Sequence, residues 1–123
     1  GNTIGKLANG IIDTPVLVSA KTNLKSGNNL VIGVATNDGL SIEAENIGKL
    51  LKQKNVFFVP FRQDNPITKP ASLLFSSVYI RETIERAFQG EQIQPILIWK
   101  ISINYKKTLE KCFLLLYNRH VKL

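Results

Sequence analysis

Two uninterrupted apolar segments, separated by a segment with helical spacing, constrain the fold of this chain more than any other feature. Residues 30–35 have the sequence LVIGVA and residues 56–59 have the sequence VFFV. Strands that are covered by helices on both faces of a parallel sheet have this composition. Between the two segments, Ile47, Leu50 and Leu51 recur at helical spacing. The order strand, helix, strand predicts a parallel βαβ unit with a right-handed crossover.

Two helices are expected before this unit. Asn2 or Thr3 can cap the first, and Pro15, preceded by Asp13 and Thr14, suits the first turn of the second. The second helix is expected to end in the turn at residues 26–29. The residues at helical spacing that should face inward are Ile4, Leu7, Ala8 and Ile11 in the first helix and Val16, Leu17, Ala20 and Leu24 in the second.

The segment after the second strand predicts less regular structure. Residues 61–77 contain Pro66 and Pro70 and are expected to form a long irregular loop, a kind of loop that is often functional. A further helix is then expected, with Glu82 paired to Arg86 and with Gly90 at its end. Its inward face should carry Ile80, Ile84, Ala87 and Phe88, and residues 94–98 should close the unit as an extended segment.

The positive charge of the chain is concentrated near its C-terminus. Residues 1–98 carry ten Lys and Arg against eight Asp and Glu, whereas residues 99–123 carry six against one. Basic and aromatic residues alternate there, which leaves a nucleic-acid-binding tail as an alternative. Leu109, Phe113 and Leu116 have helical spacing, however, so a solvated amphipathic helix is the preferred interpretation, and neither a nucleic acid nor a membrane is expected as partner.

The sequence offers little support for a metal site or for a nucleophilic residue. Cys112 and His120 are the single cysteine and the single histidine, so neither a disulfide within the chain nor a metal-ligand cluster is expected. No apolar run is long enough to predict a membrane span. A cytoplasmic protein is expected.

Candidate binding residues follow the two predicted strands. In parallel sheets, ligands bind beyond the carboxyl ends of the strands. Thr36, Asn37 and Asp38 follow the first strand. The polar residues after the second strand are Arg62, Gln63, Asp64, Asn65 and, further on, Lys69. Asn2 and Thr3 form a third candidate, because the start of a helix offers free N–H groups to a phosphate.

Each candidate also has a purely structural interpretation. Asn37, Asp38 and Gly39 together are common turn residues. Asn2 and Thr3 can be simple helix caps, and Arg62 can be a solvated surface charge. The sequence alone leaves these alternatives open.

The chain resembles a known family at these segments. Residues 1–10, GNTIGKLANG, are similar to the Asn-Thr-Ile-x-Lys-Ile-Ala-Asn-Gly stretch of flavin-dependent cysteine decarboxylases and flavin prenyltransferases. Longer strings resemble the related family of dipicolinate synthase B subunits, nearly in register over residues 1–98. These strings lie at residues 13–17, 35–38, 54–61, 63–66, 69–70 and 92–97.

The resemblance implies a three-layer α/β fold, a flavodoxin-like or Rossmann-like parallel sheet, of which residues 1–98 would be the C-terminal half. Residues 99–123 would be an unrecognised basic extension. It implies a homo-oligomeric oxidoreductase subunit that acts with an A subunit carrying NAD(P). Together they would convert dihydrodipicolinate, a dicarboxylate, to dipicolinate in the mother-cell cytoplasm of a sporulating bacterium.

The same resemblance implies roles for single residues. Asn2 and Thr3 would lie near the flavin or phosphate pocket of the wider family, and Asn37 near the reacting group. Asp38, Arg62, Gln63, Asp64, Asn65 and Lys69 are then candidates for binding the dicarboxylate. The family's glycine-rich phosphate loop has no counterpart here, so this chain alone is expected to be inactive. A free-standing FMN-binding protein is the alternative.

Overall fold

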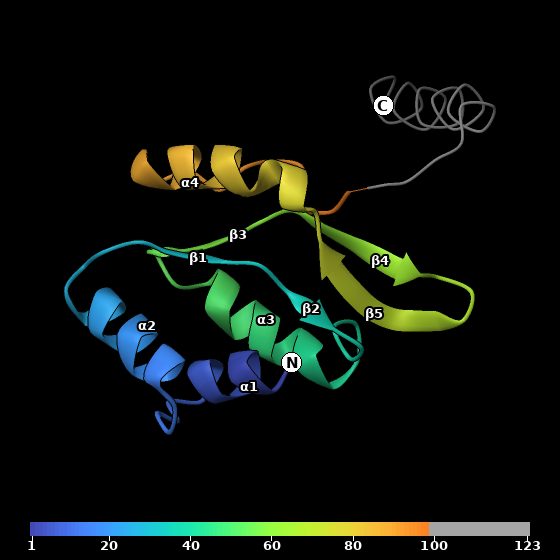
Figure 1. Ribbon diagram of the computed structural model, residues 1–123, viewed down its shortest axis with the longest axis horizontal. Helices are drawn as coiled ribbons and strands as arrows, with labels where there is room; N and C mark the ends of the chain where they lie inside the picture. Colours follow the sequence, from blue (N-terminus) through green and yellow to red (C-terminus); the bar gives the residue numbers. More distant parts are fainter. Residues whose placement is uncertain (99–123) are drawn as a thin grey trace, which may run out of the picture.

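The computed structural model describes residues 1–98, which form an α/β fold (Figure 1). The helices are α1 (Asn2–Ala8), α2 (Pro15–Lys25), α3 (Ile42–Leu51) and α4 (Ile80–Phe88), with a 3-10 helix η1 (Ser77–Tyr79) before α4. The strands are β1 (Leu30–Ile32), β2 (Ala35–Thr36), β3 (Val56–Phe58), β4 (Phe61–Asn65) and β5 (Lys69–Phe75). The predicted basic extension, with Cys112, His120 and the expected amphipathic helix, lies outside the described residues.

The predicted parallel βαβ unit is present. β1 and β3 pair in parallel, with Leu30 opposite Val56 and Ile32 opposite Phe58, and α3 connects them. α4 lies on one face of this pair, and α1, α2 and α3 lie on the other (Figure 1). The chain therefore builds a helix layer, a strand layer and a second helix layer, as the apolar segments predict.

The first predicted strand is shorter than expected. The segment 30–35 is divided between two sheets, because β1 ends at Ile32 and Ala35 already pairs with Leu74 of β5 in antiparallel orientation. The chain changes direction at Gly33, where a Cβ would lie 3.2 Å from the ring of Phe75. The Phe75 ring packs against the backbone of Gly33, which has no side chain. One apolar run therefore contributes a strand to each of the two sheets.

The prediction that residues 61–77 are irregular is wrong. β4 and β5 form an antiparallel hairpin, with Phe61 opposite Phe75 and Asn65 opposite Lys69. Pro66 lies in the turn of this hairpin. Pro70 is tolerated because β2 pairs only with Leu73 and Leu74, so no third strand needs an N–H from residue 70.

One margin of the parallel sheet is closed by the segment after α4. The Gln92 side chain accepts a hydrogen bond from the Phe58 N–H (2.8 Å) and donates one to the Phe58 carbonyl (2.7 Å). Further along, Phe61 N–H donates to the Ile96 carbonyl, and Ile98 N–H donates to the Phe61 carbonyl, each at 2.9 Å. The expected extended segment is thus confirmed, and it pairs in parallel with the start of β4.

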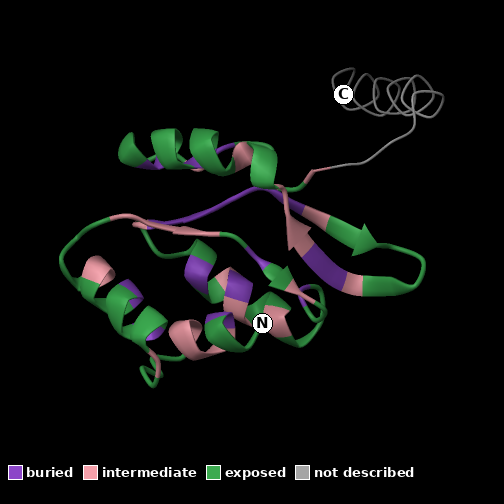
Figure 2. Ribbon diagram, viewed as in Figure 1, coloured by how far each residue is buried: buried purple, intermediate pink, exposed green. Residues whose placement is uncertain are grey.

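The core lies between the parallel strands, α1 and α3 (Figure 2). Phe58 is fully buried, and its ring meets that of Phe61 edge to face at a centroid distance of 6.2 Å. The buried apolar side chains of this cluster are Ile4, Val34, Ile47, Leu50, Val56, Phe58, Phe61 and Leu73.

The prediction of which side chains of α4 face inward is only partly correct. Ala87 is buried, but its partner is Thr83, whose hydroxyl donates to the Tyr79 carbonyl at 2.6 Å and is thereby satisfied within the helix. The apolar residues Ile80, Ile84 and Phe88 are instead exposed. The expected Glu82–Arg86 pair is replaced by Arg81–Glu85 and Arg86–Glu91.

The predicted helix starts are confirmed for α2 and wrong for α1. The Thr14 hydroxyl accepts a hydrogen bond from Leu17 N–H at 3.4 Å, with Pro15 in the first turn. Gly1 caps α1 without any side-chain hydrogen bond, so Asn2 and Thr3 lie inside the helix. Three residues expected to face inward are instead exposed: Ile11, Val16 and Leu51. Glu45 and Lys49 form the expected ion pair at 3.5 Å.

Candidate functional site

The start of α1 lies beside the loop that follows β2. A Cβ added to Gly1 would lie 2.5 Å from the Thr36 hydroxyl oxygen and 3.1 Å from Cγ of Glu43. Gly1 is exposed, as are Asn2 and Thr3 after it. The structure therefore brings together two of the three predicted segments, the first turn of α1 and the loop with Asn37 and Asp38.

Backbone hydrogen bonds hold the loop after β2 in a tight turn. The Asp38 carbonyl accepts from Ser41 N–H and Glu43 N–H, each at 3.0 Å, and the Thr36 hydroxyl accepts from Asp38 N–H at 3.3 Å. Gly39 is required because a Cβ there would lie 2.6 Å from the Leu73 side chain. These contacts support the turn interpretation, while the side chains of Asn37 and Asp38 stay exposed.

A polar network that has no clear signature in the sequence fixes α1 against α3. Asn46 donates to the Glu43 carboxylate at 3.1 Å, and Asn9 donates to the Asn46 side chain at 3.0 Å. Lys49 donates to the Asn9 side chain at 3.0 Å. The spacing of residues 43, 46 and 49 on one side of α3 is visible in the sequence. Their partner Asn9, directly after α1, lies 37 residues from Asn46 and could not be inferred. The network places a carboxylate close to the first turn of α1, with an oxygen 3.4 Å from where a Cβ of Gly5 would be.

The hairpin residues lie across β5 from the loop after β2. Leu74 of β5 stands opposite Ala35 on one side and opposite Arg62 on the other. Neighbouring strands are about 4.8 Å apart, so Arg62 starts roughly 10 Å from Ala35. Leu73 next to Leu74 is buried in the core, whereas Ala35, Leu74 and Arg62 are all at least partly accessible. These three residues form an accessible row across the three-stranded sheet.

Two of the predicted hairpin residues have structural roles. The Gln63 side chain donates to the Pro70 carbonyl at 2.9 Å, and the Asn65 side chain closes the turn by accepting from Ile67 N–H and Thr68 N–H. The charged residues at the same hairpin differ from them. Arg62, Asp64 and Lys69 take part in none of the four ion pairs found within residues 1–98. Among residues 1–98 the charges of this hairpin are therefore not used in ion pairs.

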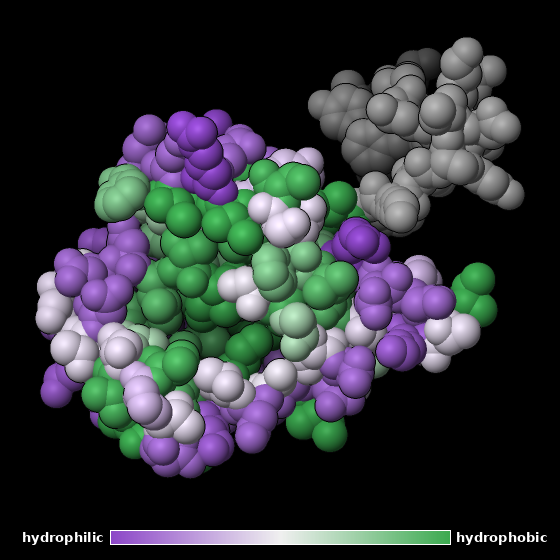
Figure 3. All heavy atoms as spheres, in the orientation of Figure 1, coloured by the Kyte–Doolittle hydropathy of each residue, from purple (hydrophilic) through white to green (hydrophobic). Residues whose placement is uncertain are grey.

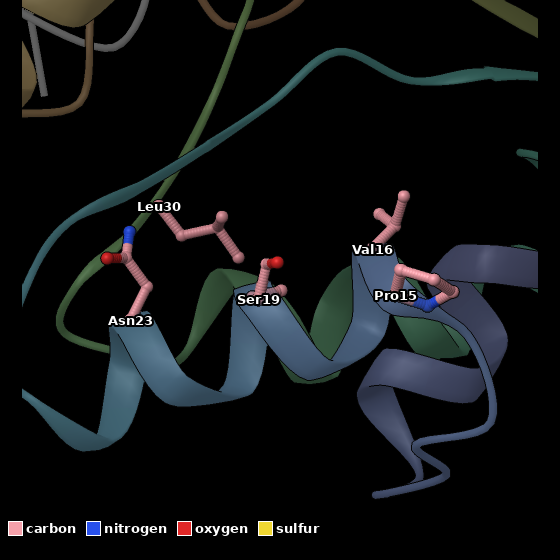
Figure 4. Close-up of a pocket in the computed structure, with 6 residues that line it drawn as sticks. Pro15, Val16, Ser19, Asn23 and Leu30 are labelled. Atoms are coloured by element: carbon pink, nitrogen blue, oxygen red, sulfur yellow. The ribbon is translucent and has the colours of Figure 1, made fainter.

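Two grooves lie away from the predicted site residues. The first has a volume of about 520 Å³ and runs between α2 and the start of β1, lined by Pro15, Val16, Ser19, Ala20, Asn23 and Leu30 (Figure 4). The second has a volume of about 420 Å³ and is lined by Pro60, Tyr79, Ile93, Gln94, Pro95, Leu97 and Ile98. The apolar residue Val16 and the apolar sequence of β1 are the sequence signals for the first groove. Helical spacing predicts that Val16 faces the core, whereas the structure shows it exposed.

Comparison with known proteins places this geometry in context. No protein-family model matches the chain. Over 98 residues the chain is 42% identical to the B subunit of dipicolinate synthase from Bacillus subtilis (strain 168), covering 80% of this chain and 49% of that protein. The crystal structure of the dipicolinate synthase B subunit from Bacillus halodurans matches with a TM-score of 0.79 and 46% identity, covering 81% of this chain and 51% of that one. The chain is therefore similar to the C-terminal part of dipicolinate synthase B subunits.

This relationship confirms the resemblance and the α/β fold expected from the sequence. The match lies in the C-terminal part of the solved chain, and this chain spans about half the length of both relatives. Within residues 1–98, no group of three or more His, Cys, Asp and Glu residues could hold a metal ion. In the same part of the chain, no helix is long and apolar enough to cross a membrane.

Proposed function

We propose that this chain forms part of a small-molecule pocket in an oxidoreductase of the dipicolinate synthase type. In this proposal an A subunit carries NAD(P) and the hydride chemistry, and the two subunits convert dihydrodipicolinate to dipicolinate in the mother cell of a sporulating bacterium. The identity of 42% to a dipicolinate synthase B subunit supports the proposal, and the word subunit in that protein's name implies a partner. The contribution of this chain would be to bind and orient the dicarboxylate.

The accessible row of Ala35, Leu74 and Arg62 is the observation that carries the proposed pocket. An apolar floor made by Ala35 and Leu74 suits the face of a six-membered ring. Arg62 is half-buried at one end of this floor, and a guanidinium can bind a carboxylate through two parallel hydrogen bonds. At the other end, the chain continues from Ala35 into the loop with Asn37 and Asp38, whose exposed side chains can contact the second half of the ligand.

The remaining hairpin residues would act at the rim of the pocket. Lys69 is exposed and stands opposite Asn65 at the outer end of the hairpin. Its ammonium group can attract a dianionic substrate over a distance of about a Debye length. In this proposal the side-chain hydrogen bonds of Gln63 and Asn65 stabilise the hairpin, and Asp64 contacts the partner subunit.

Flavin binding is the second candidate function. FMN would bring a phosphate to the first turn of α1 and a ring system to Asn37, and its chemistry would be electron transfer. Asn2, Thr3 and Asn37 are all exposed and offer no enclosing wall. The Glu43 carboxylate near the first turn of α1 would repel a phosphate, because the two groups carry like charges. The described residues alone therefore do not fit FMN, and we expect the purified chain to be colourless, whereas a yellow sample with flavin absorbance would favour the flavoprotein alternative.

Substitution of Arg62 tests the proposed pocket. The full chain is mixed with a nicotinamide-binding A subunit, and dipicolinate formation is followed by absorbance. A hydrogen bond to a charged group contributes about 1.5–3 kcal/mol, so Arg62→Ala should raise the KM for dihydrodipicolinate by roughly ten- to a hundredfold. Arg62→Lys should recover part of the loss, because it restores the charge without the paired hydrogen bonds.

Arg81→Ala is the matched control for this experiment. Arg81 lies on α4 with a side chain that is 91% exposed and paired to Glu85, so its removal should leave the KM unchanged. Equal effects of the two alanine substitutions would contradict the role of Arg62. Equal activity of the A subunit without this chain would contradict the proposed function itself.

A further inference from the structure

The second groove, of about 420 Å³, lies where the described part of the chain ends. Pro60, Tyr79 of η1 and residues of the segment 93–98 line it, and Ile98 is both a lining residue and the last described residue. None of its lining residues is charged, and only Tyr79 and Gln94 are polar. A groove with this lining suits apolar side chains better than an ion or a dicarboxylate.

The surface around this groove is also apolar. Leu97, which lines the groove, is 60% exposed, and Val78, directly before Tyr79, is 80% exposed. In the view of Figure 3, apolar side chains gather at the N-terminal end of α4, close to the point where the described residues end. Neighbouring apolar residues that are exposed together are typical of a surface that binds another segment or molecule.

A carboxylate without an ion-pair partner among the described residues lies beside the groove. Glu82 follows Tyr79 by three residues, so it lies one turn further on the same side of the helical segment. Glu82 is exposed and takes part in none of the four ion pairs found within residues 1–98. An occupant that combines apolar side chains with positive charge would therefore match this surface.

The segment of residues 99–123 has this chemistry. It carries six Lys and Arg against one Glu, and Leu109, Phe113 and Leu116 recur in it at helical spacing. The apolar side of a short amphipathic sequence is stabilised mainly by packing against another surface. The segment also begins at the groove, because residue 99 follows the lining residue Ile98.

We propose that the second groove binds the segment 99–123 of the same molecule, with apolar side chains of that segment in the groove and its basic side chains beside Glu82. The direct connection through Ile98 gives the segment a high effective concentration at the groove. Docking within one molecule is therefore favoured over docking between two copies. The inference does not rest on the proposed function, and failure of the Arg62 experiment would leave it intact.

The reactivity of Cys112, the single cysteine, tests the inference in the full chain. At helical spacing Cys112 lies on the same side as Leu109 and Leu116, so docking should shield its thiol. We expect a neutral thiol reagent to label Cys112 at least about tenfold more slowly in buffer than in urea, at a rate that does not change on dilution of the protein. Leu97→Lys should raise the rate in buffer by about fivefold or more, because a lysine in the apolar groove must be desolvated and repels the basic segment.

Leu40→Lys is the matched control for the groove. Leu40 is 51% exposed and does not line the groove, so the same substitution there should leave the labelling rate unchanged. Circular dichroism of both variants should match that of the unsubstituted chain. Equal rates for the two variants would overturn the inference, because the shielding of Cys112 would then not depend on the groove.

A second pair of variants tests the charge beside the groove. Glu82→Lys should raise the labelling rate about twofold to fivefold, the range expected for a surface charge pair. Glu85→Lys, on another side of α4 and paired to Arg81, should leave the rate unchanged. Shielding of Cys112 that is lost on dilution would indicate docking between copies and would overturn the inference. Labelling as fast as in urea until duplex DNA is added would also overturn it, in favour of a nucleic-acid-binding segment.

Discussion

The two margins, or edges, of the parallel sheet differ in whether a neighbouring segment binds their outward-facing backbone groups. On the side of β3, the backbone groups of Phe58 are bound by the Gln92 side chain, and those of Phe61 by the segment around Leu97. On the side of β1, the backbone groups of Val31 face no strand among the described residues. We call the first side the closed margin and the second side, at Val31, the open margin.

The contrast teaches where the sheet is bounded and where it is built to continue. At the closed margin the sheet passes into a hairpin whose outer strand, β4, carries Arg62, Asp64 and Asn65, the polar residues that protect an edge from pairing. At the open margin an apolar strand lies between helices with exposed apolar residues. The closed margin is a boundary of the sheet within the described residues, whereas the open margin is an apolar strand of the kind found inside parallel sheets.

The largest effect is expected from removing the closure at Gln92. Gln92→Ala leaves the N–H and C=O of the fully buried Phe58 without partners. An unsatisfied buried polar group costs about 1–3 kcal/mol, so the loss of partners for two groups should lower the free energy of unfolding by about 2–6 kcal/mol. Urea unfolding followed by circular dichroism measures this loss.

Gln94→Ala serves as the control for Gln92. Gln94 is exposed and its side chain accepts a single hydrogen bond, from Ile96 N–H at 3.2 Å. Its removal should cost no more than about 1 kcal/mol. Equal losses for the two substitutions would show that the closed margin does not depend on Gln92.

A smaller effect is expected at α2, which flanks the open margin. Thr14→Ala removes the side-chain cap of this helix and should lower the free energy of unfolding by about 1 kcal/mol. Thr22→Ala, in the exposed interior of the same helix, should change it less. If Thr22→Ala costs as much as Thr14→Ala, the cap does not hold α2 in place.

The sequence predicted the parallel unit because its strands are apolar on both faces. It did not predict that the run 30–35 is divided, because every residue in that run is compatible with a strand. The division depends on Phe75 packing against Gly33, a contact between residues 42 positions apart. The inward face of α4 was misassigned for a related reason. Thr83 is buried because its hydroxyl is satisfied by Tyr79, while the apolar stripe remains exposed.

The hairpin was missed because Pro66 and Pro70 were interpreted as excluding regular structure. Pro66 lies in a turn closed by Asn65, and Pro70 lies where β2 does not reach, so neither proline interrupts a ladder. The candidate residues themselves could be found from the sequence, because polar residues after strands are visible there. How these residues are grouped could not be found from the sequence. Arg62 and Ala35 lie in one row because both stand opposite Leu74 of β5, and this strand register is defined only in the folded chain.

Amide hydrogen exchange at Val31 tests the central contrast most directly. At a concentration where the chain is monomeric, Val31 N–H should exchange about a hundredfold faster than Leu30 N–H, which is bonded to Asn55, and than Phe61 N–H at the closed margin. Val31 protection equal to that of Leu30 in the monomer would contradict the account.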